Sequence, residues 1–202
     1  MYSIHMRILI YGYGENLGKA LMEEFTKAGH HVVAVGNQSS NAINDHFDYI
    51  NRSNFNPNTI GRIDAIIFNG SYFEKAHPLT VSKIQIETSL ERHLFDLVEL
   101  QPIILEMEKN HKGVLLVTSN ILATKAGVAS CLLSLGKSIL ESYTASIAKA
   151  LEGSGVEVKI IRVLSKITGN RSEHTEGLAS IYHLLLDYEE GISRKELVVE
   201  IP

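Results

Sequence analysis

Three glycines near the start of the chain have the spacing of a nucleotide-binding turn. An apolar run at 8–10 is followed by Gly12, Gly14 and Gly18, and a helical pattern begins at Lys19. Glycines let the main chain turn tightly and approach a phosphate, and unpaired N–H groups at a helix start face its negative charge. We therefore expect a nucleotide pyrophosphate to bind at this turn, at Gly12, Gly14, Asn16, Leu17 and Gly18.

Other reactive residue types lack the partners that their chemistry needs. Ser134 and Lys137 fit the Ser-x-x-Lys pattern of serine acyl enzymes, but the rest of that framework is missing. Cys131 is the single cysteine, has no neighbouring base in the sequence, and is expected to pack as a small apolar residue. The nine histidines show no metal-ligand spacing, so no metal site is expected.

Alternating strands and helices must position the glycine turn. After the first strand, further strands are predicted at 31–35, 47–50, 64–68, 113–119, 156–163 and 196–201. Helices are predicted from 19 onward, at 81–109 with a kink near Pro102, at 130–151 and at 176–187. Strands that are apolar on both faces indicate a sheet covered by helices on each side. We expect an α/β fold: one domain over 1–202 with a doubly wound parallel sheet in a Rossmann-like three-layer αβα sandwich.

The composition excludes several classes of protein. The formal net charge is −4, and no dense basic cluster appears, which argues against a nucleic-acid partner. No apolar run approaches the ~20 residues of a membrane span, so no membrane partner is expected. The first residues lack the basic and apolar regions of a signal peptide, and a single cysteine suits a reducing compartment. We expect a cytoplasmic protein.

Several segments together resemble the short-chain dehydrogenase/reductase family. The glycine signature of that family falls on Gly12, Asn16 and Gly18, with asparagine in place of the middle glycine. The segment 64–70 is similar to the strand that ends in Asn-Asn-Ala-Gly, and 113–120 is similar to the Gly-x-Ile-Val-x-Ile-Ser-Ser strand. The segment 150–158 resembles the following helix end and strand. The resemblance covers nearly the whole chain and implies a dinucleotide-binding fold.

The resemblance also implies where catalytic groups would stand. Enzymes of the family use a Tyr-x-x-x-Lys pair on the helix predicted at 130–151, and Lys137 occupies the lysine place. The tyrosine place holds Leu133, which has no proton to give. The catalytic serine maps onto Asn120, and the structural asparagine of the long central helix maps near Arg92 or His93.

The altered positions leave several roles open. Lys137 would hold a nicotinamide ribose, or act as an acid if burial lowered its pKa toward ~7–8. Asn120 would donate a hydrogen bond to a substrate carbonyl, or else cap a turn at the strand end. If Asn120 points into the site, alternation along the strand would point Ser119 away from it. His93 is expected on a helix surface, with the alternative that it faces the site and replaces the missing acid.

The cofactor is predicted to be NADP or NAD, with NADP slightly preferred. At the end of the second strand, Asn37 and its neighbours include no carboxylate that would repel a 2′-phosphate and no arginine that would pair with one. The resemblance implies that Asp48 holds the adenine, with capping of a loop as the alternative. Asn69 and Gly70 are expected to line the cofactor groove, because ligands bind beyond the carboxyl ends of parallel strands.

Two functions are supported by particular residues of the sequence, whereas a third, a lyase or isomerase that uses the same pocket without hydride transfer, has no residue that argues for it. The first is an atypical NAD(P)-dependent oxidoreductase that acts on a small carbonyl or alcohol substrate without the usual tyrosine. The second is a non-catalytic cofactor-binding sensor or structural pseudoenzyme of the same fold. The resemblance further implies a homodimer or homotetramer that pairs through the helices at 81–109 and 130–151.

Overall fold

A single parallel sheet forms the centre of the computed structural model, whose described residues are 5–14, 16–37, 45–164, 172–187 and 196–199. Its seven strands lie in the order β3-β2-β1-β4-β5-β6-β7, and every neighbouring pair is parallel. The order reverses beside β1, and the crevice at such a reversal is where open α/β sheets bind ligands.

The described elements begin with a strand–helix–strand unit. The strands are β1 (Arg7–Tyr13), β2 (His31–Gly36), β3 (Phe47–Asn51), β4 (Ala65–Phe68), β5 (Gly113–Asn120), β6 (Val156–Val163) and β7 (Glu196–Val199). The α-helices are α1 (Leu17–Lys27), α2 (Lys83–Leu90), α3 (Asp96–Glu99), α4 (Gln101–Lys109), α5 (Cys131–Ala150) and α6 (Ser172–Asp187). Two short 3₁₀ turns, η1 (Arg52–Asn54) and η3 (Ile121–Ala123), and one π-helical turn, η2 (Glu91–Phe95), complete the described structure.

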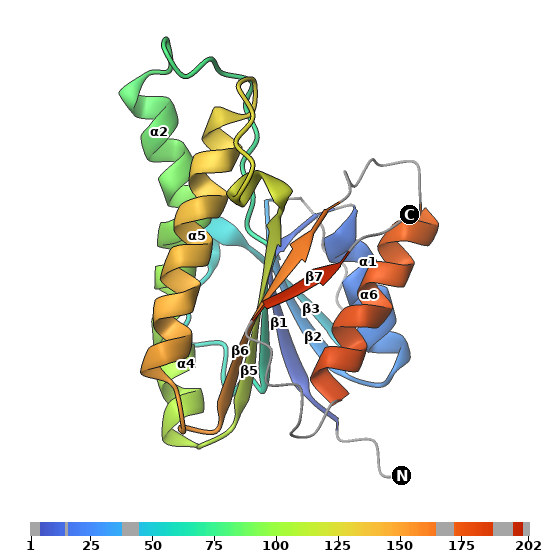
Figure 1. Cartoon of the computed structure of the whole chain (residues 1–202). Coiled ribbons are helices and arrows are strands. Elements are labelled where there is room, and N and C mark those ends of the chain that lie inside the picture. Colours follow the sequence, from blue (N-terminus) through green and yellow to red (C-terminus); the bar gives the residue numbers. More distant parts are fainter. Residues whose placement is uncertain (1–4, 15, 38–44, 165–171, 188–195, 200–202) are drawn as a thin grey trace.

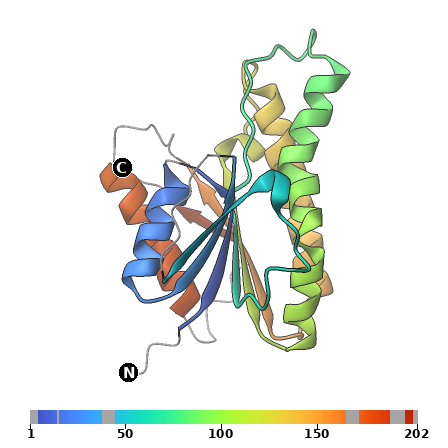
Figure 2. The same ribbon diagram turned by 180° about the vertical axis from the view of Figure 1, so that it is seen from behind.

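Helices cover both faces of the sheet, so the predicted αβα sandwich is confirmed. Helices α1 and α6 lie together on one face, and α2 to α5 lie on the other (Figures 1 and 2). Alternate residues of β1 enter the two cores: Ile8 and Ile10 pack toward α1 and α6, whereas Leu9 and Tyr11 pack toward α3 and α4. Within the described residues, no helix combines the length and apolar character that a membrane crossing requires.

The glycine turn is pressed against the neighbouring strand end. Gly12 has φ +89°, and a Cβ there would lie 2.6 Å from the carbonyl carbon of Asn69. A Cβ at Gly18 would lie 3.0 Å from the Cα of Tyr13, so α1 starts in close contact with the turn. Only glycine tolerates the positive φ and the close approach at position 12.

The predicted helix at 81–109 is divided in the structure. It contains α2, the π turn η2, α3 and α4, and Leu100 separates α3 from α4, two residues before Pro102. The predicted kink thus lies beside an observed break. The π turn at 91–95 was not predicted, because its side chains keep an ordinary helical pattern.

His93 is buried, which corrects the expectation of a surface histidine. Its side chain is fully excluded from solvent between η2 and α5. Nδ1 donates to the Ser89 carbonyl at 2.8 Å, and Nε2 accepts from the Tyr72 main-chain N–H at 3.3 Å. A Cβ at Gly136 would overlap the imidazole ring. The missing side chain at 136 therefore makes the space that His93 fills.

Replacing Gly136 by alanine should destabilise the fold, although alanine normally favours a helix. The added methyl group must displace a histidine held by two hydrogen bonds, and such overpacking costs about 1–3 kcal/mol. The matched control is Gly177→Ala in α6, where an added Cβ meets no atom within 4 Å; this change should stabilise the protein by up to ~1 kcal/mol. Thermal unfolding measures both variants, and shifts of the same sign would contradict the packing role of Gly136.

Candidate nucleotide-binding site

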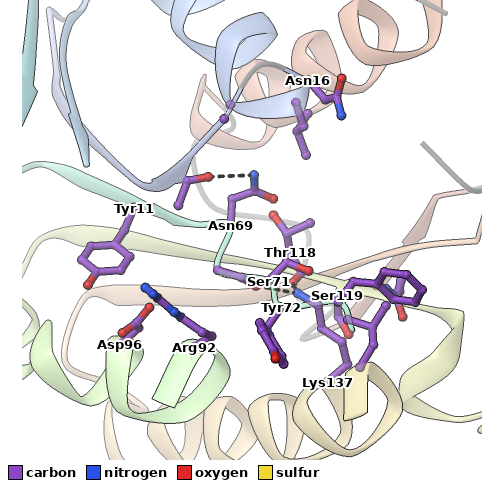
Figure 3. Close-up of a pocket in the computed structure, with 18 of the residues that line it drawn as sticks. Tyr11, Asn16, Asn69, Ser71, Tyr72, Arg92, Asp96, Thr118, Ser119 and Lys137 are labelled. Atoms are coloured by element: carbon purple, nitrogen blue, oxygen red, sulfur yellow. Dashed lines mark hydrogen bonds between the residues drawn. The ribbon is translucent and has the colours of Figure 1, made fainter. Parts of the chain in front are cut away.

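A cavity of about 1050 Å³ opens at the carboxyl ends of the strands. The glycine turn and the start of α1 form one side, and the ends of β2, β4, β5 and β6 form its floor. The helical segments η2 and α5 form the opposite side, where Arg92 and Lys137 lie (Figure 3). The size suits an extended ligand, since drug-sized molecules occupy ~300–1,000 Å³.

Ten of the eleven predicted site residues line this cavity. They come from five separate parts of the chain, which the parallel sheet brings to one edge. They are Gly12, Gly14, Asn16, Leu17, Gly18, Asn37, Asn69, Gly70, Asn120 and Lys137.

Asp48 does not lie at the cavity, and its predicted contact with adenine disagrees with its position. It is the second residue of β3, close to the amino ends of the strands. Its carboxylate lies 2.8 Å from His31 Nε2 and 3.7 Å from an Arg7 guanidinium nitrogen. The cavity is at the other end of the sheet, where Arg52 follows β3 and lines the wall.

The start of α1 presents main-chain N–H groups to the cavity. Asn16 is the N-cap residue, and its side chain makes no capping hydrogen bond. The first intrahelical bond runs from the Ala20 N–H to the Asn16 carbonyl, at 3.2 Å. The N–H groups of Leu17 and Gly18 therefore precede the intrahelical ladder, as in helix ends that bind anions.

Asn69 fixes the glycine turn from the end of β4. Its main-chain N–H donates to the Tyr11 carbonyl at 2.7 Å, and its Nδ2 donates to the Gly12 carbonyl at 3.3 Å (Figure 3). The next residue, Gly70, faces α5 and η2 closely: a Cβ there would lie 2.9 Å from the Arg92 carbonyl oxygen. The two residues thus join the turn to the opposite cavity wall.

Lys137 is a buried amino group at the cavity floor. Its side chain is nearly inaccessible, and Nζ donates to the carbonyls of Gly70 at 2.8 Å and Thr118 at 2.9 Å. Burial lowers the pKa of Lys137 to about 7, against a smaller opposing effect of Glu141. A neutral amine has two N–H groups and an ammonium has three, so both bonds persist in either state.

The residues at the positions of the missing catalytic groups are poor proton donors. Leu133 lines the cavity one helical turn before Lys137. Asn120 Oδ1 accepts from the Leu122 N–H at 3.0 Å and so caps η3, which leaves its Nδ2 group for a ligand. Ser119 also lines the cavity, and its buried hydroxyl has no hydrogen-bond partner among the described residues.

His93 cannot replace the missing acid, because both ring nitrogens already have partners. Nδ1 donates to Ser89 and Nε2 accepts from Tyr72, which fixes a neutral ring. Burial, and secondarily the nearby charge of Lys137, lowers the pKa of His93 to about 4. The ring holds the loop after β4 against α5 and supplies no proton near neutral pH.

A polar cluster that sequence reasoning missed lies where β3 and α3 approach the cavity. Arg52 Nε donates to the Tyr11 hydroxyl at 3.2 Å, and the Arg52 guanidinium pairs closely with Asp96. The Tyr11 hydroxyl in turn donates to Glu99 at 2.8 Å. Burial raises the pKa of Asp96 to about 6, against the opposing effect of Arg52. The only available signal was the position of Arg52 directly after a strand.

Two further cavity residues were missed or assigned no role. Tyr72 lies in the loop after β4, and its hydroxyl hydrogen-bonds the Glu74 carboxylate. The same carboxylate accepts from Gln85 Nε2 at 2.5 Å. Hydrogen bonding to Glu74 raises the pKa of Tyr72. Arg92 lies on η2, at the place where the resemblance had implied an asparagine.

Comparisons with known proteins identify the fold. No family model matches the sequence, and no curated protein matches it either. Solved structures do match, with TM-scores from 0.77 to 0.85. A short-chain dehydrogenase from Streptomyces avermitilis is 16% identical with a TM-score of 0.81, covering 98% of this chain and 89% of that one.

Two other structures match at similar levels. A putative 3-oxoacyl-reductase from Bacillus thuringiensis is 14% identical with a TM-score of 0.83, covering 98% of this chain and 97% of that one. A metagenomic short-chain oxidoreductase in complex with NADP is 15% identical with a TM-score of 0.83, covering 98% and 99%. The chain therefore has the fold of short-chain dehydrogenases/reductases, as the resemblance had implied.

His93 should stay neutral far below the pH at which an unperturbed imidazole titrates. Long-range ¹H–¹⁵N correlation spectra should show the proton on Nδ1 and unchanged ring shifts from about pH 8 to about pH 5. The variant His93→Asn assigns the signals. A midpoint near the ordinary histidine value would contradict the buried, doubly bonded ring and restore His93 as a candidate acid.

Proposed function

We propose that this protein binds NAD(P) in the cavity and does not carry out tyrosine-dependent carbonyl reduction. The observation that carries the proposal is the glycine turn, which opens the start of α1 onto a cavity at the sheet reversal. A metagenomic oxidoreductase and ElxO, both of similar fold, have NADP bound. The proposed role is that of a cofactor-binding sensor or structural member of this fold.

The residues present fit a dinucleotide. The N–H groups of Leu17 and Gly18 would hold the pyrophosphate, and Gly14 leaves open space beside it. Asn37 at the end of β2 would hold the adenosine ribose, with NADP slightly preferred because no carboxylate stands at that position. Lys137 keeps one N–H of its ammonium form for the nicotinamide ribose, since two are bound to carbonyls.

The chemistry of the cavity favours binding over turnover. A bound nicotinamide would supply hydride, and reduction of a carbonyl also requires a proton donor. Leu133 cannot donate one, and the Lys137 amino group is buried and already donates to two carbonyls. Asn120 can still orient a carbonyl or hydroxyl group through its amide nitrogen.

One observation favours the oxidoreductase alternative. Tyr72 brings a phenol to the cavity wall from a different element than the helix that normally carries it. Its hydroxyl donates to Glu74, which raises its pKa and keeps it protonated. An enzyme that acts on a small carbonyl or alcohol would use Tyr72 as its acid. Because the hydroxyl is committed to Glu74, we rank this function second.

The helices that flank the site also suit self-association. Exposed apolar side chains lie along them: Ile84, Phe95, Leu105 and Leu135. Burying such side chains between copies would be favourable. We propose a homodimer or homotetramer that pairs through α2 to α5.

A negative charge at position 14 should abolish nucleotide binding without harming the fold. Gly14 has no atom within 4 Å of an added Cβ and no positive φ, so Gly14→Ala and Gly14→Asp should both fold. Gly14→Asp should weaken NADPH and NADH at least about tenfold, because a carboxylate would face the pyrophosphate. Gly14→Ala is the matched control. Calorimetric titration measures both, and equal affinities would exclude binding at this turn.

The wild-type protein should bind reduced nucleotide without consuming it. Absorbance at the reduced nicotinamide band, followed with a panel of aldehydes and ketones, should remain constant. Leu133→Tyr restores the missing phenol, so a rate that appears only in this variant would show that the proton donor is what the wild type lacks. Steady turnover by the wild type, lost in Tyr72→Phe, would instead establish the oxidoreductase alternative.

A further inference from the structure

The cavity wall is more positive than the protein as a whole. The chain carries a formal net charge of −4. The charged residues that line the cavity are three bases, Arg52, Arg92 and Lys137, and one acid, Asp96. This local excess of positive charge favours an anionic ligand, since clefts lined by one sign of charge concentrate the opposite one.

Two of the three bases already have hydrogen-bond or ion-pair partners. Arg52 pairs with Asp96 and lies 3.4 Å from Glu91. Lys137 donates to two main-chain carbonyls, and its pKa is lowered. Arg92 differs from both: it is half-buried, and its side chain makes no hydrogen bond or ion pair with any residue that the structure describes. Arg92 therefore carries the uncompensated charge of the cavity.

The surroundings of Arg92 are suited to an oxyanion. Thr88 and Asp96, four residues before and after it, also line the cavity, so the segment presents one continuous polar wall. Ser71 and Tyr72 reach the same cavity from the loop after β4 (Figure 3). The Asp96 carboxylate is engaged by Arg52 and cannot also serve Arg92 fully. An incoming anion would meet a guanidinium together with hydroxyl groups.

Arg92 is held in place by contacts that do not involve its side chain. The residue after it, His93, is fixed by Ser89 and by the Tyr72 main chain. The Arg92 carbonyl lies against Gly70, where no side chain would fit. The main chain at position 92 is thus fixed at the cavity wall. Binding of a ligand by the Arg92 side chain therefore requires no rearrangement of the main chain, which favours affinity.

We propose that Arg92 binds an oxyanion group, a carboxylate or phosphate, of the ligand in this cavity. A guanidinium presents paired N–H donors that match both groups bidentately. The anionic group belongs either to the dinucleotide itself or to a separate small anionic substrate or effector that binds beside it. The proposal deepens the proposed function, on which the first of these sources rests.

The test compares wild type with Arg92→Gln, Arg92→Lys and Arg62→Gln by calorimetric titration. The probes are NADPH, NADH, inorganic phosphate and malonate, the last two with and without saturating NADPH. Arg92→Gln should weaken at least one probe about tenfold or more, whereas Arg92→Lys keeps the charge and should lose less. Arg62→Gln is the control, because Arg62 is exposed and lies outside the cavity. Circular dichroism checks that each variant folds.

The pattern of losses identifies the source of the anion. Weakened NADPH with no binding of phosphate or malonate assigns Arg92 to the dinucleotide. Unchanged NADPH with lost phosphate or malonate assigns it to a separate ligand. If the wild type binds the small anions through Arg92 but neither nucleotide, the proposed function fails and the anion site stands. Equal binding by wild type and Arg92→Gln, or no binding of any probe by the wild type, overturns the assignment of Arg92.

Discussion

The floor of the cavity depends on one buried amino group. Lys137, on α5, donates hydrogen bonds to Gly70 in the loop after β4 and to Thr118 near the end of β5. It thereby joins these three elements. Without Nζ, two buried carbonyls would lose their donor, which is costly for buried polar groups. The same loop brings the Asn69 side chain to the Gly12 carbonyl and the Tyr72 main-chain N–H to the His93 ring, and each pair forms a hydrogen bond. The burial of Lys137 can be explained by these two hydrogen bonds alone.

The cavity combines features of a nucleotide site with a poor proton supply. The glycine turn, the free start of α1 and an excess of basic residues all favour an anion. At the positions where the resemblance implied catalytic groups, the cavity is lined by Leu133 and by Asn120, whose amide caps η3. Binding determinants and proton donors are separate sets of residues, so the first set can persist when the second is lost. This separation supports a function that depends on cofactor binding more than on catalysis.

The sequence predicted the fold well because its signals are local. Apolar runs locate the strands, and the glycines at 12 and 18 act within a few residues of one another. The sequence locates a strand near Asp48 but does not show which end of that strand lies at the cavity, so Asp48 was predicted to contact the cofactor. Asp48 is the second residue of β3, whereas Arg52, at the cavity, follows β3. The burial of His93 depends on Gly136, more than forty residues away, and no local pattern reveals such a pairing.

The π turn η2 makes the cavity sensitive to chain length as well as to residue type. A π turn holds one more residue than an α-helical turn, so it acts as a one-residue insertion within the helix. Deleting one residue between 91 and 95 would restore an α-helical turn there and leave the helical segments on either side in about the same rotational phase, because a π turn takes up its extra residue locally. The deletion would mainly change which of the residues 91–95 face the cavity. The position of Arg92 at the cavity wall thus depends on the number of residues in this turn as well as on their types.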